Sequence, residues 1–167
     1  MIILATLFFL GGQPIELEEA ITPEQKAWGL MGRDKLGDNE GMLFTFDPPQ
    51  IICVWMFNCR VDLDVAFLDS DKVIREIHPL KAFPEKMDPR RPVLTLQDMR
   101  QYPPNDPIFQ FFQSQSISSS FKATYMLEMP KSWFTKNNVK TGNSLKCNEA
   151  QCYQLKEITT TESRERK

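Results

Sequence analysis

The chain has 167 residues, of which 41% are apolar, and this is enough for a single domain with one hydrophobic core. Its 20 Lys and Arg against 22 Asp and Glu give a net charge of −2, which lacks the basic excess expected of a nucleic-acid-binding protein. Four cysteines are too few for a disulfide scaffold. The spacing of Cys147 and Cys152 is looser than that of a zinc knuckle, so we expect reduced thiols, no metal and no cofactor.

The N-terminal segment, residues 1–12, is apolar and allows two interpretations. It lacks the positive charges and the cleavage site of a signal peptide, and it is too short to span a membrane. We therefore favour a hairpin, with one strand at Ile3–Leu10, a turn at Gly11-Gly12 and a second strand at Ile15–Glu19. This interpretation predicts no transmembrane segment and a cytoplasmic protein, whereas the signal-peptide alternative predicts export.

A helix is predicted to start at Thr22, because Thr is a good N-cap, Pro fits the next position and Gln25 completes a capping box. The pattern continues to Gly32, which can take the left-handed conformation at a helix end. Gly29 would let this helix lie close to another element. Arg33 follows at the negative end of the helix, where a cation is favourable.

The most apolar part of the chain runs from Gly41 to Asp69. It starts with a strand at Met42–Phe46 that we expect to end at Asp47-Pro48-Pro49. From Phe57 to Phe67 apolar and polar residues alternate, as in a strand with one buried face. If that strand is continuous, its other face carries Asn58, Arg60, Asp62 and Asp64. The alternative is a turn that uses Asn58 and Asp64 as hydrogen-bonding anchors.

The second half of the chain contains a Pro-rich insertion at residues 84–120. A partner strand at Val73–Ile77 precedes it, and a short helix is predicted within it from Asp106-Pro107. Regular structure then resumes with a strand at 123–129, a helix from Pro130, and strands at Ser144–Cys147 and Gln151–Ile158. The polar tail, residues 159–167, is expected to be disordered. These elements predict one domain at residues 1–158 of the α+β class, mainly β: a compact, mostly antiparallel sheet or partly open barrel or sandwich with two or three short helices.

Several short motifs occur in a specific order: Thr22-Pro23-Glu24, Gly29-Leu30-Met31-Gly32-Arg33, Gly41-Met42-Leu43-Phe44-x-Phe46, Trp55-Met56-x-Asn58, Leu63-Asp64-x-x-Phe67-x-Asp69, Leu127-Glu128, Trp133-Phe134 and Gly142-Asn143. Together they resemble the prokaryotic family known as domain of unknown function 192, over about Leu4 to Leu145 without the insertion. The resemblance implies a compact, mainly β domain without an established activity, and it implies that many relatives are exported. The chain departs from the family pattern at Phe57, Cys59 and Asp62, where relatives usually have Lys, Thr and Pro.

The candidate binding site combines an aromatic ring, an amide, a carboxylate and a guanidinium, which is the set that grips sugars and other small polar ligands. Its residues are Arg33, Trp55, Met56, Asn58 and Asp64. No catalytic residue is predicted, and we favour a non-enzymatic binding domain whose pocket lies around residues 55–64 and Arg33.

Two alternatives remain open. Asp62 and Asp64 would lie about 6.5–7 Å apart on one strand face, a separation that suits a hydrolase. The insertion could instead make the chain a protein-interaction module, with Phe109, Phe111 and Phe112 docking a partner.

Overall fold

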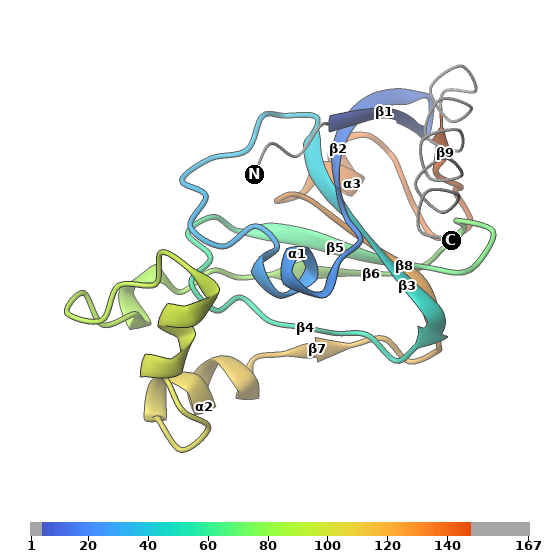
Figure 1. Cartoon of the computed structure of the whole chain (residues 1–167). Helices are drawn as coiled ribbons and strands as arrows, with labels where there is room; N and C mark the ends of the chain where they lie inside the picture. Colours follow the sequence, from blue (N-terminus) through green and yellow to red (C-terminus); the bar gives the residue numbers. More distant parts are fainter. Residues whose placement is uncertain (1–4, 148–167) are drawn as a thin grey trace, which may run out of the picture.

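The computed structural model describes residues 5–147, which form a curled half-barrel built on one seven-stranded sheet (Figure 1). The strand order is β6-β5-β8-β3-β2-β1-β9, and β2 and β3 are the parallel neighbours in an otherwise antiparallel sheet. The strands of this sheet are β1 (Ala5–Leu10), β2 (Gln13–Ala20), β3 (Glu40–Gln50), β5 (Leu63–Leu68), β6 (Ile74–Leu80), β8 (Ala123–Pro130) and β9 (Lys146–Cys147). The mainly β, mostly antiparallel architecture is confirmed.

A second, two-stranded ribbon and several short helices complete the fold. The ribbon joins β4 (Cys53–Val54) to β7 (Ile117–Ser118). The α-helices are α1 (Pro23–Trp28), α2 (Pro107–Ser114) and α3 (Trp133–Lys136), and the 3-10 turns are η1 (Pro84–Lys86) and η2 (Leu96–Gln101). None of the helices among residues 5–147 is long and apolar enough to cross a membrane. The predicted strand at Gln151–Ile158 and the tail at 159–167 lie outside the described residues.

The N-terminal hairpin is confirmed, with Gly11 and Gly12 at positive φ between β1 and β2. The capping box at the start of α1 is also present: the Thr22 hydroxyl accepts from the Gln25 amide, and the Gln25 side chain accepts from the Thr22 amide. The predicted end of this helix is wrong, however. Gly29, with φ of 52°, ends the helix four residues after Gln25, so Gly32 is not its terminus.

The position of Gly29 has a packing reason. A Cβ on this residue would lie 3.3 Å from Cζ of Phe44 on β3, a contact tighter than most real Cβ atoms make. The chain therefore passes close to the sheet where α1 ends, and a glycine with left-handed freedom makes both the approach and the turn possible. The expected close approach at Gly29 is confirmed, although it occurs beyond the helix rather than inside it.

Two strand boundaries also differ from the prediction. β3 does not stop at Asp47: it continues to Gln50 through a cis Asp47-Pro48 bond, with a shift of register against β8. The alternating stretch from Phe57 is not one strand either, because β5 begins only at Leu63. The chain turns before it, with the Cys59 amide donating to the Met56 carbonyl and Asn58 at φ of 55°. Of the two alternatives left open by the sequence, the chain takes the turn, although Asp64 lies on β5 and is not part of it.

The sheet separates two hydrophobic clusters, and the insertion covers one of them. Buried Phe57 lies 5.2 Å from Tyr102 and 5.4 Å from Phe112, measured between ring centroids, so the insertion contributes to the same cluster as β5 and β8. In Figure 1 this segment lies beside β4 and β7, with α2 at the end of the ribbon. The predicted start of α2 is confirmed, since the Asp106 carboxylate accepts from the amides of Ile108 and Phe109.

The cysteines differ from expectation at one position. Cys53 and Cys59 are free thiols, as expected, but Cys147 is disulfide-bonded. The expectation of reduced cysteines throughout the chain was therefore wrong.

We expect Phe112→Ala to lower the free energy of unfolding by about 3–5 kcal/mol, because it removes a ring that is only 1% exposed from a packed cluster. Urea denaturation would measure the change. Leu94→Ala, in the same insertion but at a side chain that is 71% exposed, is the matched control and should have little effect. Equal effects of the two substitutions would contradict a core role for the insertion.

Candidate functional site

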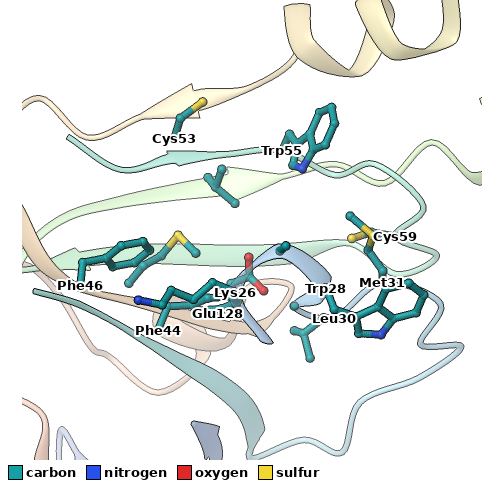
Figure 2. A pocket seen from close by; sticks show the side chains of 14 residues that line it. Lys26, Trp28, Leu30, Met31, Phe44, Phe46, Cys53, Trp55, Cys59 and Glu128 are labelled. Carbon is teal, nitrogen blue, oxygen red and sulfur yellow. The ribbon is translucent and has the colours of Figure 1, made fainter. Parts of the chain in front are cut away.

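A pocket of about 290 Å³ lies against the face of the sheet that the insertion helps to cover (Figure 2). Its walls come from α1 and the turn after it, from β3 and β8, and from the segment that contains β4. Four aromatic side chains from three of these segments line it: Trp28, Phe44, Phe46 and Trp55. Phe44 is buried, whereas the other three rings are half-buried, so the pocket remains accessible from solvent.

Glu128 forms the acidic floor of this pocket. It lies on β8 in the middle of the sheet, in register with Met42 of β3 on one side and Val65 of β5 on the other. Because residues on adjacent strands in register point to the same face, Glu128 shares the pocket face with these two apolar side chains. The residue is only 5% exposed, and burial raises the pKa of its carboxyl to about 8.

The Glu128 carboxyl has no hydrogen-bond donor or cationic partner within residues 5–147. Yet every side-chain nitrogen or oxygen that is fully enclosed in this part of the chain has a partner. The carboxyl oxygens are therefore not sealed in but open into the pocket, and Figure 2 shows them among the lining side chains. A buried, unpaired carboxyl is costly, so its presence here needs an explanation beyond packing.

The nearest polar groups do not supply the missing partner. The Lys26 ammonium donates to the Thr45 carbonyl at 2.6 Å and lies 4.8 Å from the centroid of the Phe46 ring. Cys59 is a buried thiol, and burial, with a smaller contribution from the charge of Glu128, raises its pKa. The thiol is therefore protonated at neutral pH and carries no charge that could balance Glu128.

Of the residues predicted for the binding site, Trp55 lines this pocket and the others do not. Arg33 is drawn away from it by an ion pair of 2.6 Å with Glu18 on β2. Met56 is buried in the hydrophobic cluster.

Asn58 lines a different cavity, of about 230 Å³, between residues 58–60 and the insertion. Its side-chain amide donates to the Val93 carbonyl at 3.0 Å, so it ties the turn to the insertion. It is 7% exposed, and its left-handed conformation suits an asparagine in a turn. Asn58 is therefore a hydrogen-bonding anchor of the turn, as the second alternative from the sequence predicts.

Asp64 lies on the opposite face of the sheet from Glu128. It is in register with Met129, and neighbouring residues of a strand point to opposite faces. It is 7% exposed, and burial raises the pKa of its carboxyl although the backbone amide of Ser132 donates to it. Asp64 and Trp55 therefore do not meet in one site.

Asp62 is held by two donors. Its carboxylate accepts from the Lys131 ammonium and from the Ala82 amide, each at 2.8 Å. The hydrogen bond from Lys131 is the main reason that the pKa of Asp62 lies below its ordinary value. Asp62 lies in the loop before β5, so it and Asp64 do not form the pair on one strand face that the hydrolase alternative assumes.

Sequence reasoning missed Glu128 as a site residue. The signal was present: a single acidic residue interrupts the apolar stretch from Tyr125 to Met129, in a strand that proves to be covered on both faces. A strand of an antiparallel sheet commonly has one solvated face, and on such a face a glutamate needs no explanation. Only the folded structure shows that both faces of β8 are covered and that this glutamate is enclosed.

Comparisons with known proteins agree with the fold. The profile of the family described as DUF192, Uncharacterized ACR, COG1430, matches residues 7–147. A candidate transcription regulator from Sinorhizobium meliloti 1021 is similar in structure, with a TM-score of 0.65 and 24% identity over 88% of this chain and 96% of that chain. A protein of unknown function from Novosphingobium aromaticivorans DSM 12444 has a TM-score of 0.63 and 22% identity over 85% of this chain and 84% of that one. No curated protein matches the sequence.

The raised pKa of Glu128 predicts how stability depends on pH. The folded protein keeps this proton up to about pH 8, whereas the unfolded chain releases it near 4.5. Over that window the group lowers the free energy of unfolding by about 1.4 kcal/mol per pH unit. We therefore expect Glu128→Gln to become progressively more stable than the natural protein as the pH rises through this window, with a constant difference above it.

Urea denaturation of both proteins across this pH range would measure the difference. Glu85→Gln, at an exposed glutamate in the insertion, is the matched control and should show no such trend. A difference between the Glu128→Gln variant and the natural protein that does not change with pH would show that the carboxyl is ionised in the folded state at neutral pH.

Proposed function

The chain belongs to the DUF192 family, and we propose that it is a binding domain for a small ligand with an apolar body and one polar group. The observation that carries the proposal is the Glu128 carboxyl, which is buried at the floor of an aromatic pocket and has no partner among residues 5–147. Sites for small molecules are usually concave and mostly apolar, with a few polar groups that orient the ligand. The pocket has this composition.

The walls and the floor would recognise different parts of such a ligand. Trp28 of α1 and Trp55 of the segment after β4 line the pocket, and their rings offer apolar surface. A protonated Glu128 can donate one hydrogen bond and accept another, so it can bind a hydroxyl, an amide or a carbonyl. The apolar face of a sugar ring, stacked on an aromatic side chain, is one ligand part that these surfaces suit.

This proposal keeps the expected function but centres the site on Glu128 rather than on Asn58 and Asp64. We do not propose a hydrolase, because Asp62 and Asp64 are both occupied by donors from Lys131, Ala82 and Ser132. We also do not propose docking through the phenylalanines of the insertion. Phe112 is buried, and the rings of Phe109 and Phe111 pack against other aromatic side chains.

The cellular location is part of the proposal. Disulfides persist in oxidising compartments, and the disulfide at Cys147 supports export rather than the cytoplasm. A binding domain outside the cytoplasm would meet its ligand free in the surrounding solution.

A screen of small neutral, cationic and anionic compounds would test the proposal through intrinsic fluorescence and thermal unfolding. Trp28 and Trp55 line the pocket, whereas Trp133 lies in the other cluster and donates to Asn39. We expect at least one compound class to raise the unfolding temperature and to change tryptophan emission. Both effects should be lost in Glu128→Leu.

Glu85→Leu, at the exposed glutamate of the insertion, is the control and should bind as the natural protein does. Because Leu replaces a buried carboxyl that has no partner in the described part of the chain, Glu128→Leu should be at least as stable as the natural protein. The proposal fails if no compound has an effect, or if the effects persist undiminished in Glu128→Leu.

A further inference from the structure

We propose that the polar group of the ligand is a cation, so that the pocket binds small organic ammonium compounds against the Glu128 carboxylate inside its aromatic walls. This inference rests on the proposed ligand-binding function and narrows it to one chemical class. On binding, the Glu128 carboxyl would lose its proton to solvent, and the ligand's positive charge would take the place of that proton. The ligand itself gains and loses no atom.

The aromatic walls favour a cation over an anion. The faces of Trp, Phe and Tyr rings carry negative electrostatic potential, and cages of such rings bind quaternary ammonium groups. Trp28, Phe44, Phe46 and Trp55 supply rings from α1, β3 and the segment after β4. One of them already makes this kind of contact, because the Lys26 ammonium lies 4.8 Å from the centroid of the Phe46 ring.

The charge around Glu128 leads to the same conclusion. Among residues 5–147, the ionisable groups that line the pocket with it are Lys26 from α1, Cys53 from β4 and Cys59 from the turn at 56–59. The flanking strands β3 and β5 place only Met42 and Val65 beside it.

Farther away on the same face, beyond Val65, lies His78 of β6, which contacts Glu76 at 3.0 Å. Lys26 is thus the only lysine or arginine among the described residues that line this pocket, and its ammonium is already bound to the Thr45 carbonyl. A cationic ligand would supply the counter-charge that the chain does not. An anionic ligand would either be repelled by the negatively charged Glu128 carboxylate or bind only while the Glu128 carboxyl keeps its proton.

The raised pKa of Glu128 is consistent with this role. Burial raises the pKa of Glu128 to about 8, so the carboxyl keeps its proton at neutral pH unless a positive charge comes close to it, and no uncompensated charge is buried. A cation reverses that preference, because an opposite charge close by lowers the pKa of a carboxyl. Binding and proton release are therefore linked, and affinity for the cation should rise as the pH approaches about 8.

The test uses two probes of nearly the same shape: choline, and 3,3-dimethylbutan-1-ol, in which carbon replaces the charged nitrogen. Isothermal titration of the full chain would give their affinities between about pH 6 and about pH 9. We expect choline to bind more tightly than the alcohol, with an affinity that rises about tenfold per pH unit below the pKa and then levels off. Titration in buffers of different ionisation enthalpy should show about one proton released per choline bound at pH 7.

Two variants make the result specific to Glu128. In Glu128→Gln, which keeps the shape of the side chain, choline should bind at least about tenfold more weakly and without pH dependence, whereas binding of the alcohol should be unchanged. In Lys26→Met, which removes the ammonium at the rim, choline should bind at least as tightly as in the natural protein. Loss of choline binding in Lys26→Met would contradict the inference, because removing a positive charge from the pocket should favour a cationic ligand.

The outcomes separate the two proposals. If the alcohol binds as tightly as choline, and both are lost in Glu128→Leu, the cation inference is wrong and the ligand-binding function stands. If choline binds with no pH dependence, the proton exchange at Glu128 is wrong. If neither probe binds and no compound of the wider screen does, both proposals fail.

Discussion

The backbone pairing of β8 with β3 and β5 is the constraint on which the rest of the structure depends. It makes β8 an interior strand of the sheet, and side chains on both faces of this strand are buried in the two hydrophobic clusters. Met126 and Glu128 then point to the side of the insertion, and Leu127 and Met129 point to the second cluster. The backbone hydrogen bonds of β8 with β3 and β5 therefore hold Glu128 in an apolar position, and its side chain takes no part in them.

The pocket follows from this enclosure together with one short helix. α1 is capped by Gly29, where the chain passes against Phe44, and Trp28 at the end of the helix lines the pocket. The segment after β4 brings Trp55 to the other side. The buried carboxyl is thermodynamically unfavourable for the fold alone, and strained or unpaired groups of this kind are concentrated at functional sites.

Much of the fold could be predicted from local patterns, because hairpins and caps depend on nearby residues. The Gly11-Gly12 turn and the capping box at Thr22 are such features, and both are present. The site could be predicted only at Trp55. The alternation of apolar and polar residues around Asn58 suggested a strand, but the chain turns there. Whether Asp64 or Glu128 faces the pocket depends on the register of β5 against β8. Register is a property of residues far apart in sequence, and a one-residue offset exchanges the two faces.

Two different parts of the chain hold the two sides of the pocket in place. The insertion supports the wall at Trp55, and the strands β3 and β5 support the floor at Glu128. The Trp55 ring stacks on Phe57 and meets Phe109 of α2 edge-on, with centroid separations of 5.1 and 5.2 Å. Substitutions in the insertion would therefore reshape this wall through one ring, while Glu128 would stay fixed by the two strands beside it. In the proposed binding domain, such substitutions would change the outline of the pocket without altering the charge chemistry at Glu128.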